Sequence, residues 1–386
     1  MVRIFRKDNC CGCHACGTAC PLGCIEMSAD SEGFLYPQVN EELCIDCGIC
    51  EKVCPMTSEL RQGEPPLALA AWNRNTTVRD ESSSGGVFSA LMRQTIEKEG
   101  VVIGAAFDSN MTLRHQSAQD ETESHMFRGS KYLQSIIGDA YRETQEYLQQ
   151  GRNVLFSGTP CQIAGLYAFL GKDDDNLLTC DLVCHGVPSP KVFSAYKENL
   201  ERQHKAKTQR ITFRSKVSGW KRYSVALSFA NATEYRRILT DDPFMIGFLR
   251  NTYLRPSCHL CHFSRLPRVA DISLGDFWGV GVHHPEWDDD KGTSLVLVQT
   301  PKGQKAIDAC SLALVVHEAD LTLAILSNPC ICASVQPGQQ RAAFFDDLDR
   351  LPFEQLIKKY MAPPPPWTKA IGLVRQLISY GLRLIR

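Results

Sequence analysis

Eight cysteines near the start of the chain repeat a pattern that suits iron–sulfur clusters. The run C-x2-C-x2-C-x3-C-P begins at Cys10 and recurs 34 residues later, at Cys44. In such a run three thiolates lie on one tight loop and bind three corners of a cubane, while the fourth cysteine binds the other cluster of the pair. The spacing therefore predicts two [4Fe–4S] clusters with exchanged ligands. One is expected on Cys10, Cys13, Cys16 and Cys54, and the other on Cys20, Cys44, Cys47 and Cys50.

A pair of zinc sites is the alternative use of these thiols. Structural zinc sites take four ligands, commonly as two C-x2-C pairs, rather than from this longer run, so clusters are favoured. Cys11 and Cys24 lie outside the pattern and are expected to be small buried apolar residues. Over about 50 residues this segment resembles bacterial two-cluster ferredoxins. A cluster moves one electron at a time, so the rest of the chain should hold whatever uses the electrons.

A second set of cysteines lies farther along the chain. Two strand-like apolar runs each lead to a turn with a cysteine, and a C-x2-C pair follows later, giving Cys161, Cys184, Cys258 and Cys261. Residues at the carboxyl ends of parallel strands meet at one edge of a sheet, so these four thiols could lie together. They could complete a third cubane or a zinc site, and spacing alone leaves both open.

Two further uses of these cysteines are conceivable. Cys161 could be a nucleophilic or redox-active thiol. The sequence Cys258-x-x-Cys261-His262 also fits the attachment pattern of c-type haem. Haem is attached outside the cytosol, and the first residues show no apolar stretch typical of a signal peptide, so haem is disfavoured.

A serine- and glycine-rich segment, Ser82 to Phe88, opens a predicted helix. Serine can cap a helix, and glycine lets backbone N–H groups approach an anion. The segment could bind the phosphate of a cofactor, or it could be a plain serine cap. No G-x-G-x-x-G follows a predicted strand, so the dinucleotide-binding fingerprint is absent.

The elements that would position these residues alternate along the chain. Buried strands are predicted at 101–107, 153–156 and 177–183, with helices at 86–99 and 137–150. This alternation is typical of an α/β core. Further strands are expected at 224–229 and 294–300.

Composition limits the class of protein. The chain has 386 residues, 18 cysteines and a net charge of −1. A neutral chain has no general attraction to nucleic acid, and we expect none as a partner. So many cysteines without a signal peptide indicate metal ligands in a cytoplasmic protein. The C-terminal residues 368–386 form a basic amphipathic pattern, which could contact a membrane surface or pack against protein.

Six short motifs together carry a likeness to a known family. The chain from about Ala68 to about Asn328 resembles the family of beta subunits of coenzyme F420 hydrogenases and dehydrogenases. The motifs are SSGGVF from Ser83, RGSKY from Arg128, SGTPCQ from Ser157, DLVCHGVP from Asp181, PSCHLC from Pro256 and ADISLGDFW from Ala270. Many members are fused to a two-cluster ferredoxin.

The resemblance implies cofactors and ligands. It implies FAD beside a third [4Fe–4S] cluster, with Cys161, Cys184, Cys258 and Cys261 as that cluster's ligands. It places the flavin against Ser83, Ser84, Gly85, Gly86, Lys131 and Tyr132, where Lys131 could supply charge near the flavin ring or a phosphate. No catalytic residue is assigned.

The expected fold is an α+β ferredoxin-like two-cluster domain followed by an α/β flavin-binding domain. The boundaries are residues 1–62 for the ferredoxin, 68–190 and 191–345 for the two halves of the family domain, and 346–386 for a proline-rich spacer and tail. The function implied is an oxidoreductase that passes electrons between clusters and FAD and on to a deazaflavin-like or other organic acceptor, or in reverse. A redox protein would be its partner. The alternative is an electron-transfer adaptor that serves a catalytic partner and has no organic chemistry of its own.

Overall fold

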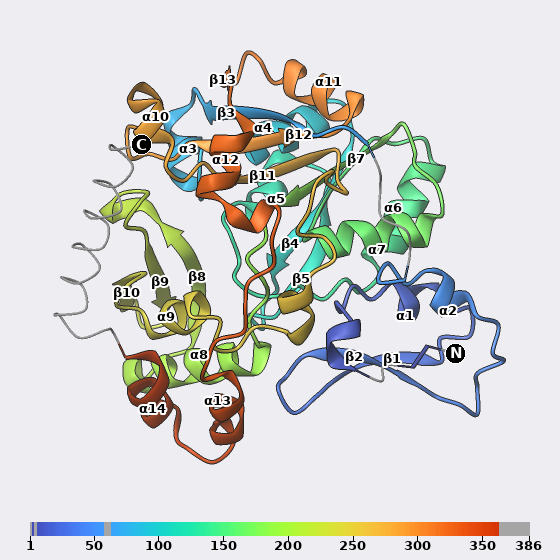
Figure 1. Ribbon diagram of the computed structural model, residues 1–386, viewed down its shortest axis with the longest axis vertical. Coiled ribbons are helices and arrows are strands. Elements are labelled where there is room, and N and C mark those ends of the chain that lie inside the picture. Colours follow the sequence, from blue (N-terminus) through green and yellow to red (C-terminus); the bar gives the residue numbers. More distant parts are fainter. Residues whose placement is uncertain (1, 4–5, 58–62, 363–386) are drawn as a thin grey trace, which may run out of the picture.

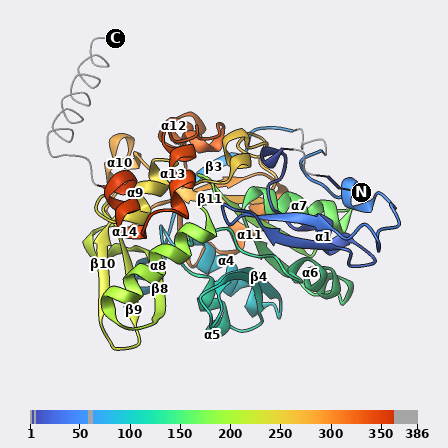
Figure 2. The ribbon, with the colours of Figure 1, turned by 90° about the horizontal axis from the view of Figure 1, so that it is seen from below.

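The computed structural model describes residues 2–3, 6–57 and 63–362 (Figures 1 and 2). The basic tail predicted at 368–386 lies outside the described residues, so its membrane contact stays a prediction. Among the helices that are described, none is long and apolar enough to cross a membrane.

The N-terminal part has the small α+β form expected of a ferredoxin. After the short helix Lys7–Asn9, strands β1 (Ile25–Ala29) and β2 (Leu35–Val39) form an antiparallel hairpin, and helices α1 (Ala15–Ala19) and α2 (Ile49–Lys52) pack together beside it (Figure 1). Each helix follows a residue in the left-handed conformation, His14 or Gly48. The two cysteine runs therefore wind in the same way, as their matching spacing predicts.

An eight-stranded mixed sheet forms the centre of the large domain. Its strand order is β13-β3-β12-β11-β7-β6-β4-β5. The four parallel strands are β4 (Val101–Phe107), β6 (Val154–Ser157), β7 (Leu177–Leu182) and β11 (Ile272–Asp276). Antiparallel strands flank them: β3 (Leu67–Asn73), β5 (Leu113–Ala118), β12 (Ser294–Val298) and β13 (Leu314–Glu318). The α/β class predicted from the sequence is confirmed, with more antiparallel pairing than the alternation alone indicates.

Helices cover both faces of this sheet because successive strand residues point to opposite sides. Val102 of β4 packs with α4 (Val87–Glu97) and α11 (Pro301–Ala309). Its neighbours Val101 and Ile103 pack with α6 (Ala140–Gln149) and α7 (Pro160–Leu170) on the other face. The remaining short helices of this domain are α3 (Thr76–Glu81), α5 (Glu121–Ser124), α10 (Val280–His283) and α12 (Leu321–Ser327), with single turns at His125–Phe127, Pro256–Leu260 (η4), Pro285–Trp287 and Pro329–Ile331.

A second lobe is built around a separate three-stranded sheet. The antiparallel strands β8 (Thr208–Ser215), β9 (Ser224–Phe229) and β10 (Glu234–Ile238) share an aromatic-rich core with helices from before and after them. Those helices are α8 (Pro190–His204), α9 (Pro243–Leu249), α13 (Arg341–Leu348), α14 (Phe353–Leu356) and the π-turn Ile357–Met361. The short turn Lys216–Ser218 connects β8 to β9.

The placement of α14 corrects the boundary expected at residue 346. Phe353, Leu356, Tyr360 and Met361 are buried in the core of the second lobe. The segment up to 361 is therefore part of the folded domain. The expected proline-rich spacer therefore cannot include residues up to 361, because their apolar side chains are buried in the core of the second lobe.

Candidate iron–sulfur centres and cofactor site

Four predicted cluster ligands line one cavity of the ferredoxin part, here called the outer cavity. It holds about 360 Å³ of space between atoms, open solvent included, and its cysteines are Cys20, Cys24, Cys44, Cys47 and Cys50. Cys20 comes from the first run, where it ends α1, and it lies with three cysteines of the second run. The structure thus groups the thiols in the exchanged manner that the spacing predicts. Which thiols bind iron stays a prediction.

Cys24 differs from its expected role. It is buried, as predicted, but its sulfur lies 3.3 Å from that of Cys20 and faces the outer cavity. Pattern matching missed it because Cys24 falls outside the repeated run. The outer cavity therefore offers one more thiol than a single cubane binds.

The other ferredoxin set lies between the outer cavity and the large domain. Cys16 lies within electrostatic range of Cys10 and Cys54, and burial together with these neighbours raises the pKa of Cys16 to about 12. Cys13 packs against α7, where a Cβ added at Gly165 would lie 3.1 Å from the Cys13 sulfur. Glycine at this position lets α7 approach the predicted ligand closely.

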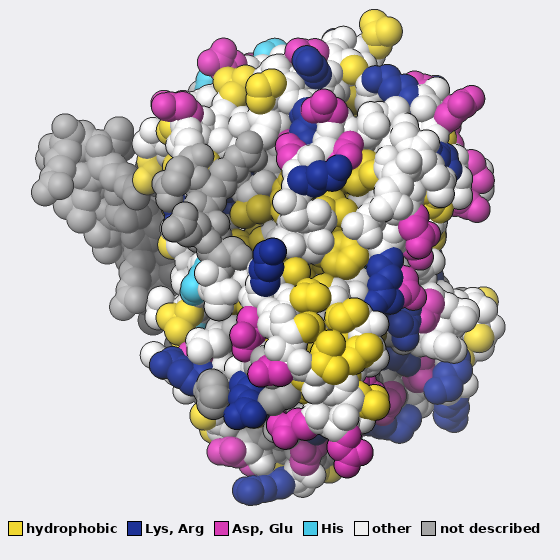
Figure 3. Space-filling view, turned by 90° about the vertical axis from the view of Figure 1, so that its right-hand side faces the viewer, with side chains coloured by type: hydrophobic (Ala, Val, Ile, Leu, Met, Phe, Trp, Pro, Cys, Tyr) yellow, Lys and Arg dark blue, Asp and Glu magenta, His cyan; other side chains and the backbone are white. Residues whose placement is uncertain are grey.

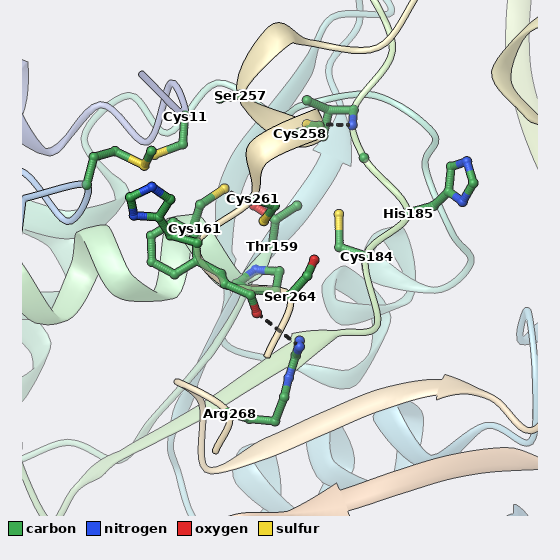
Figure 4. A pocket seen from close by; sticks show the side chains of 16 residues that line it. Cys11, Thr159, Cys161, Cys184, His185, Ser257, Cys258, Cys261, Ser264 and Arg268 are labelled. Atoms are coloured by element: carbon green, nitrogen blue, oxygen red, sulfur yellow. Dashed lines mark hydrogen bonds between the residues drawn. The ribbon is translucent and has the colours of Figure 1, made fainter. Parts of the chain in front are cut away.

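The second set of predicted ligands converges on another cavity, here called the inner cavity. It holds about 550 Å³ of space between atoms, open solvent included, and is lined by Cys161, Cys184, Cys258 and Cys261, together with Cys11. Figure 4 shows the four sulfur atoms turned toward a shared space, with Cys11 at one edge. Residues a hundred positions apart in sequence are therefore brought together.

The elements around the inner cavity explain this convergence. Strands β6 and β7 are parallel neighbours, so the segments that follow them meet at the same edge of the sheet. Cys161 lies in the first turn of α7, which Thr159 and Gln162 begin with a reciprocal capping box. Cys184 follows β7, and Cys258 lies on the turn η4, where its sulfur accepts a hydrogen bond from Val187 N–H at 3.4 Å.

The chemistry of this donor set fits a cluster. The four thiols line a cavity, which leaves room for a cubane among them. A zinc ion would need the thiolates about 2.3 Å from one point. Burial raises the pKa of Cys184 and Cys258, the latter to about 12, so any iron bound here would have to displace protons from these thiols.

Cys11 brings the ferredoxin part into the inner cavity. Its thiol lies within electrostatic range of the thiols of Cys13 and Cys161. The sequence interpretation of Cys11 as a merely buried apolar residue is incomplete, because one of its neighbours, Cys161, belongs to the large domain. No pattern within the ferredoxin run could reveal this contact.

Hydrogen bonds from the large domain hold the cysteine loop in place. Gln134 donates to the carbonyl oxygen of Cys11 at 2.7 Å, and the Tyr141 hydroxyl lies 3.0 Å from that of Cys13. Arg142 donates to the carbonyl oxygen of Thr18 at 2.7 Å. The distance between the two parts is therefore fixed by several directional contacts near the cysteines.

The predicted cofactor loop connects α3 to α4. The Ser83 hydroxyl accepts a hydrogen bond from Ser130 N–H at 2.6 Å, which brings the loop to the segment that carries Lys131 and Tyr132. Arg214 donates to the Ser83 carbonyl oxygen at 3.2 Å and lies 3.4 Å from the Tyr132 hydroxyl. The serines, Lys131 and Tyr132 are therefore neighbours.

The two glycines of this loop face protein. A Cβ at Gly85 would lie 2.3 Å from the carbonyl oxygen of Ala71 in β3. Gly86 has a φ of +84° and directly precedes α4. Glycine is thus required here by packing and backbone conformation, and a role of either residue in approaching phosphate stays a prediction.

Positive charge is concentrated around the same loop. Lys131 is half-buried, and loss of solvent around its ammonium lowers its pKa to about 7; it donates to the carbonyl oxygens of Met126 and Arg128. Lys216, whose pKa burial lowers to about 8, donates to carbonyl oxygens that include that of Ser84 at 2.9 Å. Within the described part of the chain neither lysine forms an ion pair with a carboxylate. An anionic group would stabilise both charges.

Comparison with known proteins agrees with the two-part organisation of the chain. Residues 151–323 match the family described as the C terminus of the beta subunit of coenzyme F420 hydrogenase/dehydrogenase. This segment belongs to that family. Residues 9–58 match a 4Fe–4S dicluster domain. The resemblance inferred from the motifs is confirmed.

Curated relatives cover parts of the chain. An uncharacterised protein of Methanocaldococcus jannaschii is 24% identical over 209 residues, which are 45% of this chain and 56% of that protein. The F subunit of the F(420)H(2) dehydrogenase of Methanosarcina mazei is 22% identical over 174 residues, or 42% of this chain and 49% of that relative. The chain thus spans about half the length of these relatives.

The F420-reducing [NiFe] hydrogenase complex from Methanosarcina barkeri contains a chain of similar structure. It matches with a TM-score of 0.48 and 19% identity, and the match covers 71% of this chain and 92% of that one.

Proposed function

We propose that the chain is an iron–sulfur flavoprotein oxidoreductase. It would pass electrons between [4Fe–4S] clusters and FAD and on to a deazaflavin-like or other organic acceptor, or in the reverse direction. The observation that carries this proposal is the inner cavity, where four thiols of the family domain meet Cys11 of the ferredoxin part. A redox centre there would lie at the junction of the two domains.

The ferredoxin part offers a place for electrons to enter or leave. Cys47 is exposed at the outer cavity. Four large apolar side chains of this part are also exposed, Leu22, Leu43, Ile45 and Ile49, and Figure 3 shows apolar side chains gathered on this face. An exposed apolar patch of this kind is typical of protein contact sites, so a redox protein is the expected partner.

The residues around the Ser83 loop support a flavin. FAD supplies chemistry that joins one-electron and two-electron transfer. Lys131 and Lys216 would neutralise its phosphates, and the serines of the loop offer hydroxyl groups beside them. Arg128 and Arg214 each keep a buried Nε atom without a hydrogen-bond partner in the described structure, which leaves donors for a bound polar group.

Cofactor analysis of the full chain tests the proposal directly. The protein would be purified without oxygen, reconstituted with iron and sulfide, and assayed for iron, zinc and flavin. Three clusters require about twelve irons per chain, and two require about eight. Finding about eight irons with one tightly bound zinc would contradict a third cluster.

An adaptor without organic chemistry is the second candidate, favoured by the inward packing of Gly85 and Gly86. It predicts that the reconstituted chain binds clusters but no flavin. A screen of deazaflavin and other organic acceptors with chemically reduced protein then separates the two candidates, because only the flavoprotein would reduce an acceptor without a catalytic partner.

A further inference from the structure

Arg255 lies at the junction between the two cysteine-rich regions. Its side chain is fully buried, with 0% exposure. Its guanidinium donates to the carbonyl oxygens of Cys10 and Leu35, both at 2.9 Å. One nitrogen also lies 3.6 Å from the sulfur of Cys10. The charged end of the side chain therefore touches a predicted iron ligand.

This charge has no carboxylate partner within the described residues. Its contacts are backbone carbonyls, the amide oxygen of Gln134 at 3.4 Å, and the rings of Tyr36 and Phe34, whose centroids lie 4.3 and 5.6 Å away. Carbonyls and ring faces stabilise a cation, but they carry no net charge. Removing one partner of a buried charge is strongly destabilising, so a buried guanidinium without an anion calls for a counter-charge.

The cysteine loop is shaped to admit this group. Gly12 has a φ of +68°, and a Cβ there would lie 2.8 Å from a guanidinium nitrogen of Arg255. The backbone of Arg255 continues into η4, where its carbonyl oxygen accepts a hydrogen bond from Cys258 N–H at 3.0 Å. One residue thus contacts the ferredoxin loop and begins the segment that carries two inner-cavity thiols.

We propose that Arg255 sets the reduction potential of the cluster on Cys10, Cys13, Cys16 and Cys54. This rests on the proposed binding of clusters at these positions. A cubane with four thiolates is anionic and gains one more negative charge on reduction. A positive charge stabilises the reduced form more than the oxidised form, because the reduced form is more negative. The effect is large for a buried charge, since the interaction is strong where water is excluded. Arg255 therefore raises the potential of this cluster above the value it would have without the buried charge.

Redox titration of the reconstituted full chain, followed by electron paramagnetic resonance, tests this role. Arg255→Gln should shift the midpoint of the Cys10 cluster to lower potential and leave the outer cluster unchanged. Arg255→Lys keeps the charge and should return the midpoint most of the way to that of wild type. Arg142→Gln is the matched control, since Arg142 joins the same two domains but contacts the Thr18 carbonyl rather than a thiol.

The outcomes separate this proposal from the function on which it rests. Wild-type protein without iron on the Cys10 set contradicts the proposed function. If Arg255→Gln retains iron and its Cys10 cluster keeps the wild-type midpoint potential, only the role of Arg255 is overturned. The same holds if Arg142→Gln shifts that midpoint equally. If Arg255→Gln loses iron, the Arg255→Lys variant decides. The role of the charge is supported if Arg255→Lys retains iron and its Cys10 cluster has a midpoint potential near that of wild type. The role is overturned if that midpoint is far lower or if both variants lose iron.

Discussion

The outer and inner cavities offer similar thiols in different settings. Each is lined by four predicted ligands and a fifth cysteine. The outer cavity draws its thiols from residues 20–50 of one small domain, and one of them, Cys47, is exposed. The inner cavity draws its thiols from α7, the end of β7, η4 and the ferredoxin loop.

This difference separates local from assembled sites. Tight loops with left-handed residues form the outer cavity, so short-range sequence specifies it. The inner cavity exists only when the parallel strands align and the ferredoxin docks. We therefore expect the inner site to depend on the fold of the large domain and the outer site to be largely independent of it.

The largest expected effect comes from removing a thiol of the inner cavity. Cys161→Ser should lower the iron content of reconstituted protein from about twelve to about eight per chain, because a cubane normally requires all four thiolates. Flavin reduction through the ferredoxin clusters should be lost as well. Cys310→Ala is the control, since Cys310 is buried at the end of α11 away from both cavities. An unchanged iron count in Cys161→Ser would exclude a third cluster on this residue.

The exchanged ligands of the outer cavity give the next largest effect. In a Cys24→Ala background, which removes the neighbouring thiol, Cys20→Ala should eliminate the cluster bound by Cys44, Cys47 and Cys50, leaving about eight irons. Adding Cys47→Ala should cause no further loss, because both residues serve one cluster. Adding Cys16→Ala instead should remove a second cluster and leave about four. If adding Cys47→Ala removed a second cluster and adding Cys16→Ala caused no further loss, each run would bind its own cluster.

The cofactor loop should respond more moderately. Lys216→Met removes a charge that would pair with a phosphate, and hydrogen bonds to charged groups contribute about 1.5–3 kcal/mol. Flavin affinity should fall by about 10- to 100-fold, measured by flavin retention on dialysis. Lys221→Met is the control, because Lys221 pairs with Asp288 at the surface. Equal retention in the two variants would remove Lys216 from the flavin site.

Solution pH gives a second measure of the same lysine. Burial lowers the pKa of Lys216 to about 8, so the ammonium form is favoured below that pH and is lost as pH rises through it. Flavin retention should therefore be higher at pH 7 than at pH 9. In Lys216→Met this difference should shrink, and a pH dependence of undiminished size would point to another titrating group.

The sequence was informative where structure is local. The paired cysteine runs predicted the grouping around the outer cavity, and alternating apolar runs predicted β4, β6, β7 and the α/β class. The second lobe was not predicted, because nothing in the spacing of β8 to β10 indicates that they leave the main sheet. Arg255 and Cys11 were missed as well, since their importance depends on how two domains dock.

The smallest effects should come from the fifth cysteine of each cavity. A single cubane binds four thiolates, so Cys11→Ala and Cys24→Ala should each keep about twelve irons and cost about 1 kcal/mol of stability.

The two fifth cysteines differ in which lost ligand each could replace. Cys24 lies 3.3 Å from Cys20 in the same short segment, so it could take over as a ligand in Cys20→Ala. Cys11 is held by Gln134 through its own carbonyl, and we expect it to be too constrained to replace Cys161. Iron retained by Cys20→Ala but lost by Cys20→Ala with Cys24→Ala would demonstrate local rescue. Equal rescue of Cys161→Ser by Cys11 would show that the inner cavity adapts as readily as the outer one, and the distinction between local and assembled sites would fail.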